Sequence, residues 1–207
     1  TVDTNIITAE DPVEFNLYGI NQVLVRTQIG MTFAAALRAF LRQDPNIIML
    51  GEIRDLETGE IAIKAALTGH LVLSTLHTND CPSTITRLID MKLEPFNVAS
   101  ALSLLTAQRL ARRICKKCKV EATYDQDYFE AAKLPLDWAD QQTFYKGEGC
   151  NECNGMGYKG RCGFYEVMIM STPLRKAVMK EVPTDDLRDL ACSEGMLTLR
   201  QDGMKKV

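Results

Sequence analysis

The stretch Ile47-Ile48-Met49-Leu50-Gly51-Glu52 decides the fold class. Four consecutive apolar residues predict a parallel strand buried on both faces, because only a covered sheet accepts an unbroken apolar run. A small residue and an acid follow directly, as in a Walker B segment. There the sheet presents a carboxylate to magnesium and to the water that attacks a phosphate. The same pattern also fits a buried strand that simply ends in an acid.

The flanking sequence predicts alternating strands and helices. Strands are expected at residues 5–9, 23–27 and 70–76, and helices at residues 33–42 and 56–68. Thr32 and Asp55 stand where helix N-caps belong. Strand and helix in alternation predict an α/β fold with a mostly parallel sheet, which places ligands at the carboxyl ends of its strands.

Two further helices are expected downstream, one opened by Pro82 and a longer one from about Phe96. The inward face of the longer helix would carry Val98, Leu102, Leu105 and Leu110. Composition changes at about Ile114. The chain is therefore divided into an α/β part at residues 1–113, an irregular cysteine-rich element at 114–163 and a small helical region at 164–207.

Polar residues follow three of the predicted strands and so point to one site at one sheet edge. They are Glu10, Asp11 and Glu14 after the first strand, Glu52 and Arg54 after the third, and His77 after the fourth. His70 and His77 bracket the fourth strand, and a structural role for either histidine is the alternative. For the acids after the first strand, the alternative is a solvated turn at Pro12.

Four of the seven cysteines form two C-x₂-C pairs, Cys115/Cys118 and Cys150/Cys153, with residues 119–149 between them. Two such pairs can close the Cys₄ shell of a structural Zn²⁺ ion. Neighbouring lysines would offset the negative charge of four thiolates. Two unrelated reduced pairs or a disulfide are the alternatives. The adjoining cluster Arg112-Arg113…Lys116-Lys117…Lys119 fits a solvated face or a docking surface for an acidic partner or lipid headgroups.

The charge, the hydropathy pattern and the cysteine content limit the kinds of protein that this chain can be. The formal net charge is -3, so the overall charge does not favour nucleic acid or an anionic membrane as a partner. No apolar stretch is long enough to cross a bilayer, and the first residues do not resemble a signal peptide. The cysteine usage suits a reducing cytoplasm. The chain begins without methionine and runs almost directly into a strand, so we expect a piece of a longer protein.

Three motifs together resemble the secretion-superfamily ATPases. Residues 9–14 (AEDPVE) resemble their aspartate box, residues 50–55 (LGEIRD) their Walker B segment, and residues 68–80 (TGHLVLSTLHTND) their histidine box. Order and spacing match across the whole chain. The assembly ATPases of type IV pili and type II secretion match best, which implies a partial RecA-like P-loop NTPase domain.

The resemblance implies a role for each matching residue. Glu52 would act on the attacking water and the Mg²⁺ shell, and His70 and His77 would sense or stabilise the γ-phosphate of ATP. Glu14, with Glu10 and Asp11, would line the site, and Arg54 would hold the Walker B loop. Three arginines are candidates to face a neighbouring subunit's phosphates: Arg26, Arg38 and Arg42.

One departure from the family pattern is the P-loop. G-x-x-x-x-G-K-[ST] is absent, and no Gly-Lys dipeptide occurs in the sequence. The resemblance implies that this motif lies just upstream of Thr1. Since that loop supplies most of the phosphate affinity, we expect the 207 residues alone neither to bind ATP tightly nor to hydrolyse it.

The resemblance also supports zinc, because the assembly ATPases carry a tetracysteine element at this place. It implies a homo-hexameric motor at the cytoplasmic face of the inner membrane, peripherally associated through an inner-membrane platform protein. Two other functions compete with this one. The first is a zinc-binding adaptor with a non-catalytic α/β scaffold, and the second is a related DNA-transfer ATPase, which the acidic net charge disfavours.

Overall fold

The computed structural model describes residues 3–206. The chain divides into two compact units. The first comprises the chain up to Ala107 together with Glu166–Thr198, and the second comprises Gln108–Tyr165 with the segment from Leu199 onward. The division into residues 1–113, 114–163 and 164–207 stays a prediction.

The first unit contains a four-stranded, entirely parallel sheet, as expected from the sequence. Its order is β2-β1-β3-β4. The strands are β1 (Ile6–Glu10), β2 (Asn21–Leu24), β3 (Ile47–Leu50) and β4 (Leu71–Ser74). Ile48 is paired with Ile7 on one side and Val72 on the other, so these three residues share a face of the sheet.

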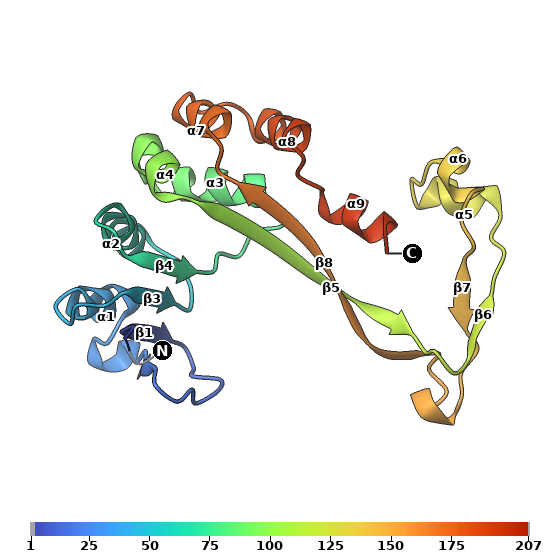
Figure 1. The fold of residues 1–207 in the computed structure, drawn as a ribbon, viewed down its shortest axis with the longest axis horizontal. Helices are drawn as coiled ribbons and strands as arrows, with labels where there is room; N and C mark the ends of the chain where they lie inside the picture. Colours follow the sequence, from blue (N-terminus) through green and yellow to red (C-terminus); the bar gives the residue numbers. More distant parts are fainter. Residues whose placement is uncertain (1–2, 207) are drawn as a thin grey trace. The chain divides into compact units, whose positions relative to one another are not determined.

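Helices α1 (Phe33–Phe40) and α2 (Leu56–Leu67) pack against that face (Figure 1). Each begins at its predicted cap: the Thr32 hydroxyl accepts the Ala35 N–H at 3.1 Å, and the Asp55 carboxylate accepts the Thr58 N–H at 2.8 Å. The short helix η1 (Thr27–Ile29) precedes α1. Leu37, Ile48 and Leu50 are fully buried between helices and sheet.

A second core in the first unit joins distant parts of the chain. It is built by α3 (Cys81–Asp90), α4 (Pro95–Ala101), α7 (Thr172–Met179) and α8 (Thr184–Ser193). Figure 1 shows α7 and α8 beside α4 and α3. The side chains of Ile85, Val98 and Val178 are completely buried there. Helices α7 and α8 therefore belong to the same core as α3, the helix that follows the loop carrying His77.

The predicted long helix from Phe96 is wrong. Helix α4 ends at Ala101, and β5 (Leu104–Ile114) follows and pairs with β8 (Tyr158–Ile169). Leu110, expected to face inward, is 53% exposed. Over a short apolar run, the residue spacing of a helix is hard to distinguish from that of a strand. The pairing of β5 with β8, some fifty positions away, outweighs the conformational propensity of the local sequence. For the same reason Phe164–Ile169 is strand rather than the start of the helical region.

The second unit is more ordered than the irregular segment expected. It contains the antiparallel pair β6 (Lys119–Glu121) and β7 (Tyr145–Gly147), with α5 (Gln126–Ala131), α6 (Leu136–Ala139), η2 (Asn151–Cys153) and α9 (Leu199–Met204). A cluster of aromatic rings forms a small core beside β6 and β7: Tyr124, Tyr128, Phe129, Trp138 and Phe144.

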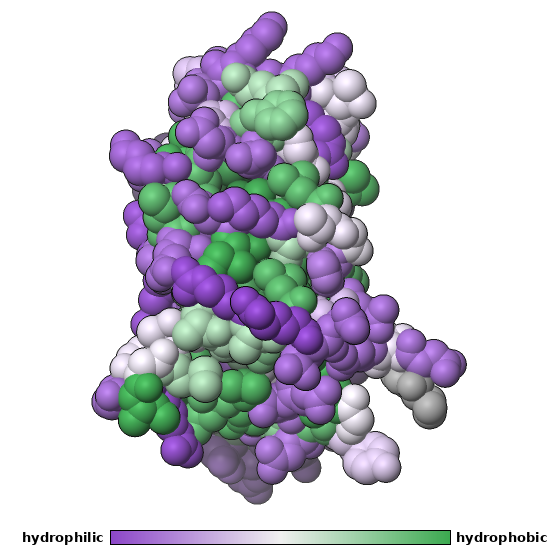
Figure 2. Space-filling model, turned by 90° about the vertical axis from the view of Figure 1, so that its left-hand side faces the viewer, coloured by the Kyte–Doolittle hydropathy of each residue, from purple (hydrophilic) through white to green (hydrophobic). Residues whose placement is uncertain are grey.

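The surface is mixed in character. On the face shown in Figure 2, hydrophilic side chains separate several hydrophobic patches rather than flanking one continuous band. Among the described residues, no helix has the length and hydropathy needed to cross a membrane.

Candidate nucleotide site and metal centre

The loops that follow β3 and β4 are hydrogen-bonded to each other at the carboxyl edge of the sheet. The Thr75 hydroxyl donates to the Gly51 carbonyl at 2.6 Å, and the Ile53 N–H donates to the Thr75 carbonyl at 3.1 Å. Because β3 and β4 are parallel neighbours, their ends emerge at the same edge. These bonds bring the segment around Glu52 next to the segment around His77.

Glu52 is the centre of this cluster. It is 8% exposed, and its Oε2 lies 3.0 Å from Nε2 of His77. Its Oε1 lies 2.5 Å from Nη2 of Arg54. The hydrogen bond to Glu52 and the charge of that carboxylate raise the pKa of Arg54. With both oxygens engaged, the carboxylate is held in one orientation at the end of a buried strand.

The acidic residues at the end of β1 and in the loop after it take little part in the cluster around Glu52. Oε1 of Glu10 accepts hydrogen bonds from the Thr8 hydroxyl at 2.5 Å and from Nε2 of Gln22 at 2.9 Å. Asp11 is near enough to contribute to the raised pKa of Arg54, although less than Glu52 does. Glu14 is exposed and forms no hydrogen bond or ion pair with residues 3–206. The structure thus brings Glu52, His77 and Arg54 into contact, and Glu14 does not share in these contacts.

His70 lies at the opposite edge of the sheet from His77. It precedes β4 and its Nδ1 lies 2.9 Å from the Ala65 carbonyl, at the end of α2. The Thr68 hydroxyl is 3.3 Å from the same nitrogen. These contacts match the structural role that the sequence left open for His70. Of the three candidate arginines, Arg38 forms an exposed ion pair with Glu57 on α2.

The sequence did not indicate several residues that hold the loop after β4. Thr75 could have been noticed, since it lies inside the histidine-containing stretch. Asp80 is paired with Arg188 at 3.2 Å, and the Cys81 N–H is bound by Glu166 at 2.7 Å. These partners are 108 and 85 positions away, and no local pattern could have found them.

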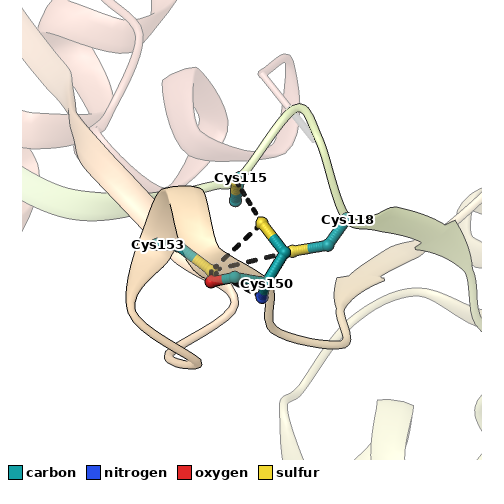
Figure 3. Close-up of side chains that lie close together, drawn as sticks. All are labelled: Cys115, Cys118, Cys150 and Cys153. Atoms are coloured by element: carbon teal, nitrogen blue, oxygen red, sulfur yellow. Dashed lines mark hydrogen bonds between the residues drawn. The ribbon is translucent and has the colours of Figure 1, made fainter.

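The four paired cysteines converge in the second unit (Figure 3). Their sulfur atoms all lie within 4.8 Å of one another. Cys115 and Cys150 are 3.9 Å apart, Cys118 and Cys153 are 3.8 Å apart, and Cys150 and Cys153 are 3.8 Å apart. A disulfide requires about 2.05 Å, so these thiols are free. The disulfide alternative is therefore excluded for these pairs.

The donor set fits a zinc ion. Zn–S bonds of about 2.3 Å at tetrahedral angles separate the sulfurs by roughly 3.8 Å. The backbone N–H groups of Cys150 and Gly157 each donate to Sγ of Cys153 at 3.2 Å. Burial raises the pKa of Cys153, but these N–H bonds, together with hydrogen bonds from the thiols of Cys150 and Cys118, outweigh it and lower that pKa to about 7. Thiolate is the form that binds metal.

A close approach of two backbone segments shapes the metal-binding loop. A Cβ placed on Gly157 would lie 2.4 Å from the Gly147 carbonyl oxygen, and one on Gly147 would lie 2.0 Å from the Gly157 carbonyl oxygen. Gly157 also has φ +75°. The N–H of Cys115 donates to the Gly157 carbonyl at 2.9 Å. Only glycine fits at both positions, and the approach brings the two cysteine pairs together.

These features define an α/β protein with an acid-and-imidazole cluster at the carboxyl edge of its parallel sheet and a tetracysteine centre. The chain belongs to the type II/IV secretion system protein family, whose family model matches residues 1–207. The resemblance inferred from the three motifs is thereby confirmed.

Curated relatives agree with this assignment. The chain is 54% identical to the type IV pilus assembly ATPase PilB of Myxococcus xanthus, over all of this chain and 37% of the relative. It is 50% identical to PilB of Thermus thermophilus, over all of this chain and 23% of the relative. The type II secretion system protein HxcR of Pseudomonas aeruginosa is 48% identical, over 97% of this chain and 39% of its own length. The chain thus spans about a third of such relatives.

Solved structures support the fold. The pilus retraction motor PilT with bound ADP has a TM-score of 0.64 and 30% identity, covering 96% of this chain and 47% of PilT. The ATPase DotB of Legionella pneumophila has a TM-score of 0.66 at 22% identity, covering all of this chain and 49% of DotB. The partial ATPase-type fold expected from the sequence is confirmed.

Proposed function

We propose that the longer protein containing this chain is an ATP-hydrolysing motor that powers the assembly of type IV pili or of type II secretion pseudopili. The observation that carries the proposal is the contact of Glu52 with both His77 and Arg54 at the carboxyl edge of the sheet. The names of the curated relatives supply the biological context.

Glu52 would take the chemical role. Its carboxylate is held by Arg54 and His77, and it would orient the attacking water and accept its proton. His77 is 85% exposed in its side chain although it contacts Glu52, so it can also reach a phosphate oxygen. A bound Mg²⁺ would neutralise charge on the phosphates, and carboxylates such as Glu52 are suitable to hold its water shell.

The phosphate cradle is not among these residues, since no P-loop occurs in the sequence. We therefore expect the 207-residue chain alone to show neither tight ATP binding nor turnover. ATP hydrolysis that stays with the 207-residue chain through further purification would contradict this expectation. Titration with a fluorescent ATP analogue checks the binding half of it.

The tetracysteine centre would hold a structural Zn²⁺ through Cys115, Cys118, Cys150 and Cys153. A closed shell of four thiolates leaves no open position for catalysis, so its role is to fix the loops of the second unit. As part of the same proposal, the motor is a homo-hexamer that lies at the cytoplasmic face of the inner membrane and docks on a platform protein. That part rests on the family resemblance.

A cellular assay separates the motor from a zinc-binding adaptor. Glu52→Gln in the full-length protein should abolish pilin or pseudopilin assembly while the protein stays present at wild-type level. Glu60→Gln, which removes an exposed acid on α2, serves as the matched control and should retain assembly. Normal assembly with Glu52→Gln would contradict the motor and favour the adaptor. Salt-dependent DNA binding would instead favour the DNA-transfer ATPase.

A further inference from the structure

The loop that carries His77 is fixed to the first turn of α3. Asp80 is the N-cap of this helix, and its Oδ1 accepts the Ser83 N–H at 2.8 Å. The hydroxyls of Thr78 and Thr84 are 2.7 Å apart, and the Thr84 hydroxyl donates to the Asp80 carbonyl at 3.1 Å. Since Thr78 directly follows His77, a shift of this turn is passed on to His77.

The first turn of α3 is held in turn by the C-terminal part of the first unit. Nη2 of Arg188, on α8, lies 3.2 Å from Oδ2 of Asp80. Oε1 of Glu166, on β8, accepts the Cys81 N–H at 2.7 Å. Glu166 is only 2% exposed, and a buried carboxylate is tolerated where hydrogen bonds compensate its lost hydration. The turn therefore has two distant anchors.

The Arg188–Asp80 pair is the more sheltered of the two ion pairs that Arg188 makes. Asp80 is 23% exposed in its side chain, whereas Asp185, the other partner of Arg188, is 84% exposed. Burial opposes ionisation of Asp80, but hydrogen bonds from Ser83 and the charge of Arg188 outweigh it and lower its pKa. Screening by salt and water weakens the exposed pair much more than the sheltered one.

We propose that Arg188 is a positioning residue for ATP hydrolysis, acting through Asp80 and the first turn of α3 to hold His77 against Glu52. The contacts form one uninterrupted chain from α8 to the carboxyl edge of the sheet. The inference rests on the proposed ATPase function. It assigns α8 a second role beyond packing, because a displacement of α8 would change the geometry of the nucleotide site.

Steady-state ATP hydrolysis by the full-length protein tests the proposal. Arg188→Ala and Asp80→Asn should each lower kcat about tenfold or more, with little change in KM for ATP, because small misplacements of catalytic groups are costly. Asp80→Asn keeps a good N-cap and so isolates the ion pair from the stability of α3. Arg188→Lys, which retains the charge, should keep more activity than Arg188→Ala.

A background lacking His77 separates positioning from general stability. In His77→Ala, adding Arg188→Ala should change kcat by less than about twofold, because the residue through which Arg188 acts is already gone. A merely structural Arg188 would lower kcat equally in both backgrounds. Asp185→Asn is the matched control: it removes the exposed ion pair on the same helix and should leave kcat within about twofold of wild type.

The outcomes are distinguishable. Wild-type kcat in Asp80→Asn, or additive losses in the His77→Ala background, would overturn the positioning role while leaving the ATPase proposal intact. Wild-type turnover by Glu52→Gln, measured alongside, would overturn the ATPase proposal itself. If Arg188→Ala fails to fold, Asp80→Asn and its combination with His77→Ala decide the matter.

Discussion

The imidazole of His77 lies 3.0 Å from the carboxylate of Glu52, although twenty-five positions separate the two residues. They meet because β3 and β4 are parallel neighbours whose following loops are joined by Thr75. His70 precedes β4 at the other edge of the sheet, where it is hydrogen-bonded to the Ala65 carbonyl. The two histidines of one short stretch therefore occupy different environments.

This difference predicts unequal effects of replacing the histidines. His77→Ala in the full-length protein should lower kcat for ATP about 100-fold, because it removes a group that contacts Glu52. His70→Ala should lower kcat less than about threefold and act mainly by loosening the end of α2. Steady-state kinetics with a thermal unfolding control checks both. Equal losses in the two variants would mean that His70 also reaches the nucleotide.

The metal centre predicts about one zinc ion per chain. Cys118→Ser should lower bound zinc well below that and destabilise the second unit, since structural zinc contributes directly to folding. Elemental analysis of purified protein measures the stoichiometry. Cys162→Ser is the matched control, because Cys162 lies outside the cluster and should leave zinc unchanged. Equal zinc content in both variants would refute the assignment of ligands.

The close backbone approach predicts a steep cost for a side chain at Gly157. Gly157→Ala should destabilise the second unit by about 1–3 kcal/mol, because its Cβ would overlap the Gly147 carbonyl. Gly155→Ala shares the strained backbone, with φ +76° against +75°, but has nothing within 4 Å of the added Cβ. The two variants thus separate overlap from backbone strain. The rate of zinc loss to a chelator should rise clearly more for Gly157→Ala than for Gly155→Ala.

The lowered pKa of Asp80 predicts how the start of α3 responds to acid. A folded pKa below the unfolded value, about 3.9, gives stability that is complete above that value and lost as pH falls through the folded pKa. Hydrogen exchange of peptides from the start of α3, corrected for intrinsic rates, should accelerate below about pH 4 in the wild type. Asp80→Asn has no proton to gain there and should lack the step. The same step in both proteins would assign it to another group.

Local patterns predicted the parts of the fold that depend on local chemistry. The strand at Ile47–Leu50 and the helices capped by Thr32 and Asp55 are present where periodicity and capping placed them. The strand β5 was missed, because its partner β8 lies far along the chain and pairing, not propensity, determines its conformation.

In the candidate site, too, some features could be predicted from the sequence and others depend on the tertiary structure. The contact of Glu52 with His77 follows from adjacent parallel strands, and the cysteine cluster follows from paired spacing. The exposure of Glu14 depends on the course of the irregular loop after β1, which no periodicity encodes. The anchoring of Asp80 by Arg188 depends on how α8 packs in the second core, which only the tertiary structure reveals.

The most direct test of the central claim is ATP turnover by Glu52→Gln in the full-length protein, together with its nucleotide affinity. The amide keeps the shape of the side chain but cannot accept a proton from water. We predict a kcat at least about 100-fold below wild type with nearly unchanged affinity for ATP. A kcat within about threefold of wild type would contradict the assignment of Glu52, and with it the nucleotide site at this edge of the sheet.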